Sequence, residues 1–362
     1  MEKIGKVINK IKAENLSSFF FSSHSNVFYL TGFSSTNAFV LLTEKNRYFF
    51  TDNRYYLGAK KKLKDWEVIL IEGLNDIKDN LISLGGNRIG FEKDKTTISF
   101  YENLTSNSDL DKKLIGYAGF LDEIRAIKTG EEINTIKEAV EKTDEIFNYI
   151  VNNINSFSTE LDVRREIVNQ IFLKKGEGES FPAIVAFGEN SAIPHYQTSD
   201  IEIKRGAPLL IDMGMKYKGY CSDFTRTIFI GNVSQTYGLS RKAQKLRDIY
   251  EIVKEANIEA TNIVKEGITA REVDLKAREL IKRYGYGDYF IHSTGHGIGI
   301  DIHEFPRISY KSDTVLKEGM IFTIEPGIYI KGLGGVRLEN VVLCKKDKGE
   351  VLTKTSLDLI EV

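Results

Sequence analysis

The sequence predicts an α/β domain followed by a larger α+β domain. In residues 1 to about 120, helical patterns alternate with short apolar runs such as 17–21, 38–42 and 67–71. This alternation is typical of α/β layers. The 362 residues are too many for one typical domain and suit two. We place the boundary after residue 125, which gives domains of residues 1–125 and 126–362.

Threonine caps mark the helices of the second domain. Thr129 precedes Glu132 by three residues, which is the pattern of a capping box. Further helices are expected from about residue 159 to 175, after Ser240 and after Thr269. A capped helix leads into strands twice, which hints at two related α+β halves. The helix after Thr129 carries these apolar residues on one face: Ile133, Ile136, Val140, Phe147 and Ile150.

Composition excludes several classes of function. The chain carries 50 basic and 51 acidic residues, so its net charge of −1 does not draw it to nucleic acid or to an anionic membrane. Its apolar runs are too short to cross a bilayer, and we find no signal-peptide core. Two cysteines, Cys221 and Cys344, make no disulfide framework in a chain of this length. We therefore expect a cytoplasmic protein without a nucleic-acid or membrane partner.

A first predicted hairpin carries an aspartate on each arm. Asp212 lies in the largely apolar run 209–214, and Asp223 follows eleven residues later. We predict that the two aspartates lie directly opposite each other, which centres the turn between Tyr217 and Lys218. Residues that face each other in this way have their side chains on one face of the sheet and close together. Two like charges at that distance repel unless a cation lies between them.

A second predicted hairpin carries a glutamate on each arm, Glu325 and Glu339. Pairing these residues centres the turn on Gly332, within a glycine-rich segment. Pro326 and Gly327 allow a bulge in the first arm, which loosens the register. The second hairpin is therefore expected to resemble the first, with two carboxylates brought together.

Four carboxylates and an imidazole on apolar segments predict a pair of divalent metal ions. His296 lies between Gly295 and Gly297, which let the backbone approach a ligand closely. Two divalent ions would balance four carboxylates that are otherwise costly to bury. The oxygen-rich set favours Mn²⁺ or Co²⁺, with Fe²⁺ or Zn²⁺ as alternatives, over a structural zinc site. Each segment alone is more simply explained as a turn or loop, but together they predict metal-assisted hydrolysis.

These residues closely resemble the pita-bread metallopeptidases, and within them the proline-specific branch of prolidases and aminopeptidases P. The resemblance rests on the segments 211–214, 222–227, 295–299, 303–307, 324–327 and 336–340. Segments 26–33, 51–55 and 121–128 extend it to a creatinase/prolidase-like N-terminal domain. Asn340 departs from a common form that has aspartate after the glutamate. The resemblance implies a pita-bread catalytic domain over residues 126–362, after an N-terminal domain over residues 1–125.

The resemblance also implies the metal ligands and their chemistry. Asp223 and Glu339 would bridge both ions, and Glu325 would in addition shuttle a proton to the leaving nitrogen. His195 would contact the substrate, and His303 would stabilise the reacting carbonyl. The implied ligands of the two metal ions are Asp212, Asp223, His296, Glu325 and Glu339.

Three further residues would bind substrate or support the ligands. Arg337 resembles an arginine that pairs with a ligand carboxylate. Arg307 resembles a prolidase residue that meets the substrate carboxylate, and a surface ion pair is the alternative. His292 resembles a supporting histidine near the metals, and a core histidine is the alternative.

The implied activity is hydrolysis of the Xaa-Pro bond, in dipeptides or at the N-terminus of short peptides with proline in the second position. Two divalent ions per subunit would supply a bridging hydroxide near neutral pH. Arg307 favours a dipeptidase, because an arginine can clamp a carboxylate at two points. A homodimer is also implied. The alternatives are a metal-free creatinase-like amidinohydrolase and a non-catalytic binding module of the same fold, and the complete ligand set argues against both.

Overall fold

The structure is a computed structural model that describes residues 2–231 and 241–362. The chain divides into two compact units, one ending at Arg125 and the other beginning at Ala126. None of the helices in the described ranges is both long and apolar enough to cross a membrane.

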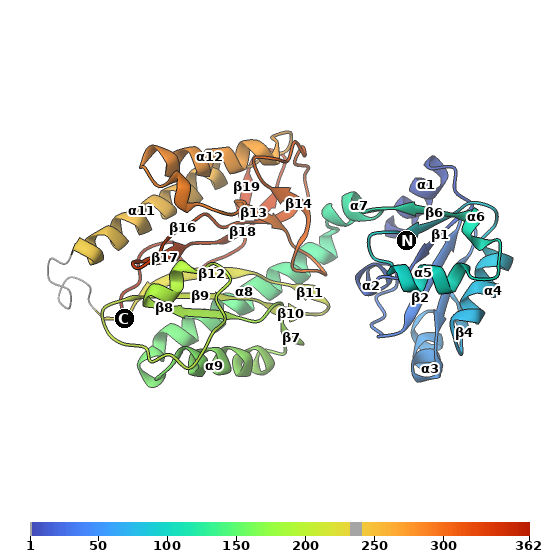
Figure 1. Ribbon diagram of the computed structural model, residues 1–362, viewed down its shortest axis with the longest axis horizontal. Helices are drawn as coiled ribbons and strands as arrows, with labels where there is room; N and C mark the ends of the chain where they lie inside the picture. The colour runs from blue at the N-terminus through green and yellow to red at the C-terminus, as the bar shows by residue number, and fades with distance from the viewer. Residues whose placement is uncertain (1, 232–240) are drawn as a thin grey trace. The chain divides into compact units, whose positions relative to one another are not determined.

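The first unit is built on one six-stranded sheet with the order β4-β3-β2-β1-β5-β6 (Figure 1). β2 is antiparallel to both of its neighbours, whereas the pairs β1–β5, β3–β4 and β5–β6 are parallel. The strands are β1 (Ser18–Phe21), β2 (Ala38–Thr43), β3 (Arg47–Thr51), β4 (Glu67–Leu70), β5 (Ile89–Glu92) and β6 (Leu114–Tyr117). The helices are α1 (Glu2–Ala13), α2 (His24–Thr31), α3 (Asn53–Lys62), α4 (Leu74–Leu84), α5 (Ile98–Thr105), α6 (Leu110–Lys113) and α7 (Asp122–Ala126). The predicted α/β character of this region is confirmed.

In the second unit, strands lie between two pairs of helices (Figure 1). The strands form sheets with the orders β12-β9-β8, β14-β13-β15-β18-β19, β16-β17 and β11-β10-β7. The helices are α8 (Gly130–Asn152), α9 (Glu160–Leu173), α11 (Arg241–Asn262) and α12 (Ala270–Arg283), with 3₁₀ turns η1 (Ile154–Ser156), η2 (Gly188–Ala192) and η3 (Gly287–Tyr289). The strands are β7 (Gly178–Glu179), β8 (Ile184–Phe187), β9 (Pro208–Met213), β10 (Met215–Tyr217), β11 (Tyr220–Cys221), β12 (Phe224–Phe229), β13 (Gly295–Gly297), β14 (Glu304–Ile308), β15 (Ile321–Ile324), β16 (Gly327–Ile330), β17 (Gly334–Arg337), β18 (Asn340–Cys344) and β19 (Gly349–Val351).

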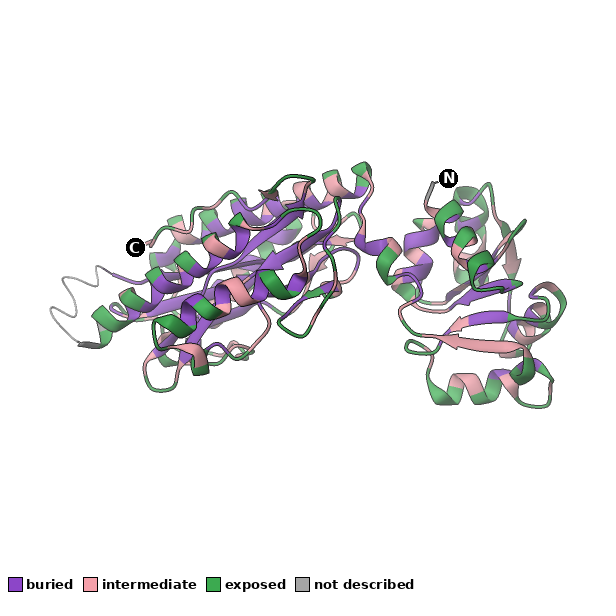
Figure 2. Ribbon diagram, turned by 90° about the horizontal axis from the view of Figure 1, so that it is seen from above, coloured by how far each residue is buried: buried purple, intermediate pink, exposed green. Residues whose placement is uncertain are grey.

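The predicted threonine caps begin three of the four long helices. Thr129, Thr159 and Thr269 each accept a hydrogen bond from the backbone three residues later, and each belongs to a complete capping box. The apolar face predicted for α8 is buried at all its positions except the half-buried Ile133. Figure 2 shows the same division, since the strands between the helices are buried and the outward faces of the helices are exposed.

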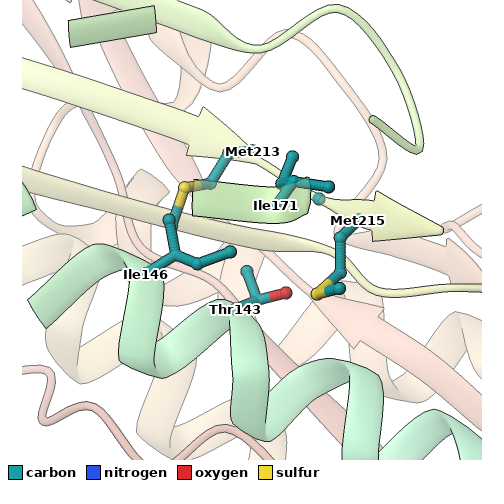
Figure 3. Close-up of a pocket in the computed structure, with 6 residues that line it drawn as sticks. Thr143, Ile146, Ile171, Met213 and Met215 are labelled. Carbon is teal, nitrogen blue, oxygen red and sulfur yellow. The ribbon is translucent and has the colours of Figure 1, made fainter. Parts of the chain in front are cut away.

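Alternation along β9 decides what each residue faces. Leu209, Ile211 and Met213 pack into the core made with α8 and α9, so the residues between them face the other way. Figure 3 shows Met213 beside Ile146 of α8, in an apolar gap that leaves no space for a water molecule. Asp212 is therefore directed away from this core.

The register of the first hairpin differs from our prediction by two residues. Thr225, rather than Asp223, pairs with Asp212, and Lys218 and Gly219 form the turn. Their φ angles of 49° and 80° are both positive, as a type I′ turn requires. The predicted turn centre would have forced a tyrosine into that conformation. A shift of two residues preserves side-chain direction, so Asp223 stays on the side of Asp212.

The second hairpin has the predicted register. Ile324 pairs with Asn340, and Gly327 pairs with Arg337, so the two arms are in the same phase on both sides of the glutamates. The bulge that Pro326 and Gly327 would allow therefore does not occur. The two glutamates fall where the hairpin passes from the five-stranded sheet into the two-stranded sheet.

Replacing Ile211 by alanine should lower the free energy of unfolding by about 2–5 kcal/mol, because the fully buried side chain leaves a cavity against α8 and α9. Ile211→Val should cost only about 0.5–1.5 kcal/mol. Urea denaturation followed by far-UV circular dichroism measures both changes. Trp66, the single tryptophan, lies in the first unit. A loss detected only by tryptophan fluorescence would contradict the assignment of Ile211 to the second core.

Candidate metal centre

Three buried carboxylates meet in the second unit. Carboxylate oxygens of Asp212, Asp223 and Glu339 all lie within 4.8 Å of one another. The residues come from the end of β9, from the link between β11 and β12, and from the link between β17 and β18. They are 9%, 5% and 1% exposed, so little of their charge is solvated.

Strand alternation directs the second hairpin toward this cluster. Val336 and Leu338 pack into the core made with α11 and α12, which turns Arg337 and Glu339 the opposite way. Glu325 follows β15, where Phe322 and Ile324 belong to the same core. The apolar residues next to the glutamates face the core, so the glutamates face the carboxylate cluster.

His296 points a ring nitrogen at two carboxylates. Its Nδ1 lies 3.1 Å from the carbonyl oxygen of Gly297, so Nδ1 carries the hydrogen and donates it. Its Nε2 lies 3.5 Å from Asp223 Oδ2 and 3.3 Å from Glu325 Oε1. Burial alone would lower the pKa of His296, but the hydrogen bond and charge of Glu325 raise it. A cation must occupy this position, either a proton on Nε2 or a metal ion bound to it.

Gly295 allows the histidine strand to approach β15. A Cβ atom at this position would lie 1.9 Å from the carbonyl oxygen of Thr323, so any other residue would push the strands apart. The Thr323 hydroxyl accepts a hydrogen bond from the backbone N–H of His296 at 3.1 Å and donates to Glu325 Oε1 at 3.2 Å. Thr323 thereby links the two residues.

Three of the four carboxylates have raised pKa values. Burial, followed by the charges of neighbouring acids, raises the pKa of Asp223 and Glu339 well above ordinary values. Burial also raises the pKa of Asp212, although Arg337 acts against it. For Glu325, burial acts upward too, but the hydrogen bond and charge of the adjacent imidazole lower the pKa to about 2.

The donor set fits divalent metal ions. Glu339 Oε2 accepts a hydrogen bond from Thr225 Oγ1 at 2.8 Å, but the buried Oε1 has no partner among the residues described. A buried carboxylate oxygen without a partner is costly. Carboxylates and one imidazole, with one buried oxygen that no described residue engages, are ligands suited to Mn²⁺ or Co²⁺.

Arg337 forms an ion pair with one carboxylate of the cluster. It is buried, and its Nη2 lies 2.5 Å from Asp212 Oδ2. Its Nη1 donates at 2.7 Å to the hydroxyl of Tyr329, which lies 2.8 Å from Nε2 of His292. His292 Nδ1 faces the carbonyl oxygen of Ser293 at 2.8 Å, so Nε2 accepts the tyrosine hydrogen. His292 thus lies behind the arginine, and burial lowers its pKa.

Three predicted residues lie on the exposed side of the cluster. The ring of His303 is centred 4.3 Å from that of His296, and its pKa is lowered by burial and then by the charge of His296. His195, in the loop after η2, is close enough to lower it further. Arg307 pairs with His296 across β14 and β13, which puts both side chains on one face. Arg307 is exposed, and no ion pair engages it in the described parts of the chain.

An ion pair between a buried aspartate and a half-buried arginine, which our sequence analysis missed, supports the histidine segment. Asp274 of α12 pairs with Arg278 at 2.8 Å and accepts a hydrogen bond from the backbone N–H of Thr294 at 2.9 Å. Arg278 donates to the carbonyl oxygens of Phe290 and His292 at 3.0 Å and 2.7 Å. The i,i+4 spacing of acid and arginine is visible in the sequence, but an exposed helical pair has the same spacing.

Known proteins match both units of this chain. Residues 134–346 match Metallopeptidase family M24, and residues 3–127 match the Creatinase/Prolidase N-terminal domain. A relative named Xaa-Pro dipeptidase, from Pyrococcus furiosus, is 37% identical over 360 residues, which are 99% of each chain. A relative named putative Xaa-Pro aminopeptidase, from Mycoplasma genitalium, is 34% identical over 355 residues, which are 98% of this chain and 97% of that protein.

Solved structures agree in the fold. An Xaa-Pro dipeptidase from Bacillus anthracis superposes with a TM-score of 0.92 at 36% identity and covers 100% of this chain and 99% of its own. An X-Pro aminopeptidase from Thermotoga maritima gives a TM-score of 0.89 at 33% identity, with 99% of each chain covered. The predicted α+β pita-bread fold and the creatinase/prolidase-like α/β domain before it are confirmed. This chain belongs to metallopeptidase family M24 and is similar over its full length to Xaa-Pro dipeptidases and aminopeptidases.

Proposed function

We propose that this protein is an exopeptidase with two divalent metal ions that hydrolyses the Xaa-Pro bond of dipeptides or of short peptides at their N-terminus. The observation that carries the proposal is the buried cluster of Asp212, Asp223 and Glu339, with His296 and Glu325 beside it. Relatives named for Xaa-Pro cleavage cover nearly the whole chain.

We propose these five residues as the metal ligands, with Asp223 and Glu339 shared by both ions. The unpartnered oxygen of Glu339 and the Nε2 of His296, turned to two carboxylates, support this assignment. When bound, two such ions would supply a hydroxide nucleophile near neutral pH and polarise the scissile carbonyl. Mn²⁺ or Co²⁺ suits the oxygen-rich set best.

The chain's own residues would then handle the protons and the developing charge. Glu325 lies beside the imidazole of His296 at the centre of the site, where its carboxylate would accept a proton from the nucleophile and pass it to the leaving nitrogen. Burial and neighbouring charge keep His303 neutral, and a neutral imidazole N–H beside the site can donate a hydrogen bond to the developing oxyanion. His195 lies near His303 and would contact the substrate.

Specificity for proline has a physical basis. The nitrogen of an Xaa-Pro bond carries no hydrogen, and the ring fixes the shape of the residue that follows the cleaved bond. A site built for that ring needs no hydrogen-bond acceptor for this nitrogen, but it must deliver a proton to it as the bond breaks. The position of Glu325 beside the cluster suits this delivery.

Arg307 supports the narrower proposal of a dipeptidase. Its guanidinium is exposed on the face that carries His296, and no ion pair holds it within the described residues. In a dipeptide the free carboxylate belongs to proline itself, so a cation close to the metal centre would bind it. A longer peptide has no carboxylate at that position.

Asp223→Ala or His296→Ala should reduce hydrolysis of Gly-Pro by at least ~100-fold, because even the supporting partners of metal ligands typically contribute 10–100-fold. The exposed Asp313, paired with Arg271, provides a matched control, and Asp313→Ala should retain full activity. Product release is measured with the bound metal of each variant quantified by elemental analysis. Near-normal turnover by either ligand variant at equal metal content would reject the assignment.

Removing metal with a chelator should abolish activity, and Mn²⁺ or Co²⁺ should restore it. The loaded protein should also resist unfolding better, because an ion at 100 times its dissociation constant contributes about 2.7 kcal/mol. Thermal unfolding with and without the ion measures this difference. A chelated protein that hydrolyses Xaa-Pro substrates at the original rate would be inconsistent with a metallopeptidase.

Arg307→Ala should raise the KM for Gly-Pro roughly 10-fold or more, since a charged hydrogen bond is worth about 1.5–3 kcal/mol. The KM for a longer Xaa-Pro peptide should change little. Lys311→Ala, at an exposed cation four residues further along the chain, serves as the control. Equal losses on both substrates would argue against carboxylate recognition by Arg307 and in favour of an aminopeptidase.

A further inference from the structure

Asn257 joins the two backbone segments that carry Glu325 and Glu339. It lies on α11 and is fully buried, on a helix whose neighbouring positions are apolar core residues. Its side-chain Nδ2 donates at 2.7 Å to the carbonyl oxygen of Ile324 and at 2.9 Å to that of Leu338. Each carbonyl belongs to the residue directly before one of the two glutamates. One amide group therefore sets the spacing of the backbone on both arms of the hairpin.

The orientation of this amide is fixed by its neighbours. Both hydrogens of Asn257 Nδ2 are used by the two carbonyls, so its Oδ1 must face Asn340, whose Nδ2 donates to it at 3.1 Å. Asn340 Oδ1 in turn accepts from Nη2 of Arg226 at 3.0 Å. Hydrogen bonds thus run in one direction, from Arg226 through Asn340 to Asn257. Reversing either amide would bring two acceptors or two donors together.

Arg226 anchors the far end of this chain of hydrogen bonds. It is buried, and its Nη1 donates to the carbonyl oxygen of Glu339 itself. Its Nε and Nη2 donate to the carbonyl oxygens of Ser356 and Thr355 at 3.0 Å and 2.6 Å. The backbone of Glu339 is therefore held on both sides. Arg226 bonds the carbonyl oxygen of Glu339, and Asn257 bonds the carbonyl oxygen of Leu338, the residue before it.

Asn340 is suited to its place in this chain in a way that an ionised aspartate would not be. An amide donates and accepts at once, whereas a carboxylate only accepts. With a carboxylate at this position, Asn257 Oδ1 would lose the shorter of its two donors and keep the Thr261 hydroxyl at 3.4 Å. The position where this chain departs from the common form of its family is thus the link between Arg226 and Asn257.

We propose that Asn257 is a positioning residue for metal binding, which holds Glu325 and Glu339 at the separation that the two ions require. This inference rests on the metal site of the proposed function, but not on the identity of the substrate. The hydrogen bonds of Asn257 join it to two backbone carbonyls, Thr261 and Asn340 rather than to a ligand side chain, so we expect it to act through the backbone of the two glutamates.

The test measures metal binding by the full-length protein rather than turnover. Metal-free protein is titrated with Co²⁺ by calorimetry, and the visible absorption of the bound Co²⁺ is recorded. Asn257→Leu removes the donors at similar volume. Val253→Ala is the matched control, because it damages the same core one helical turn earlier without removing a hydrogen bond.

Asn257→Leu should weaken Co²⁺ binding 10–100-fold and alter the absorption spectrum, as loss of a supporting partner of metal ligands typically does. Val253→Ala should keep the Co²⁺ affinity and the absorption spectrum of the parent protein, even if its melting temperature falls as much as that of Asn257→Leu. If Asn257→Leu does not fold, Asn257→Ala is the second variant, because it leaves room for a water molecule to donate hydrogen bonds to the two carbonyl oxygens. Its Co²⁺ affinity and absorption spectrum should change in the same direction by a smaller amount.

The inference would be overturned if the asparagine variants bound Co²⁺ as tightly as Val253→Ala of the same stability. It would also be overturned if the parent protein bound no Co²⁺. A parent that binds Co²⁺ but does not cleave Xaa-Pro peptides, with weakened binding in Asn257→Leu, would remove the proposed substrate and support the positioning role.

Discussion

Mutual repulsion between buried carboxylates is the constraint around which the second unit is organised. Two unit charges about 4 Å apart repel by about 4 kcal/mol at the effective dielectric constant of a protein interior. Asp212, Asp223 and Glu339 meet at such distances, and Glu325 lies next to them across the imidazole of His296. The guanidinium that touches Asp212 offsets only one of these charges. The remainder must be met by protons or by metal ions, and the fold keeps the group together in either case.

Ordinary strand geometry brings these charges to one place. On the strands that carry the acids, the apolar residues pack against a helix pair, and the residues between them turn toward the centre. The two hairpins contribute from opposite helix-covered layers. Buried polar residues then hold the chain where the strands end: Thr225 bonds the carboxylate of Glu339, Asp274 bonds the backbone of the histidine segment, and Asn257 bonds the backbone of the second hairpin. Each of them comes from a different element.

Local signals in the sequence were sufficient for the caps, the apolar faces and the second hairpin, because each depends on neighbours within about one turn or one tight loop. The first register was wrong for a local reason: pairing Asp212 with Asp223 ignored the preference of a two-residue turn for glycine at its second position, which Gly219 supplies. Candidate ligands were identifiable by type and order, and the structure brings three of them within one cluster.

The supporting residues could not be predicted in the same way. Tyr329 and Asn257 act on groups far away along the chain or on another element, and nothing in the spacing of a tyrosine or a helical asparagine indicates a buried partner. Arg307 and His195 remain predictions for a related reason. Their side chains are exposed, so the folded protein alone does not define what they bind.

The raised pKa values of Asp223, Glu339 and His296 have a consequence for how the site fills. Without metal, these groups retain hydrogen ions at pH values where ordinary acids have released them. On the proposed ligand assignment, an incoming divalent ion would displace those hydrogen ions, so uptake would acidify the medium and become more favourable as the medium becomes more alkaline. Loading of the proposed centre would therefore be an exchange of one kind of cation for another, and its occupancy would follow the acidity of the surroundings as well as the supply of metal.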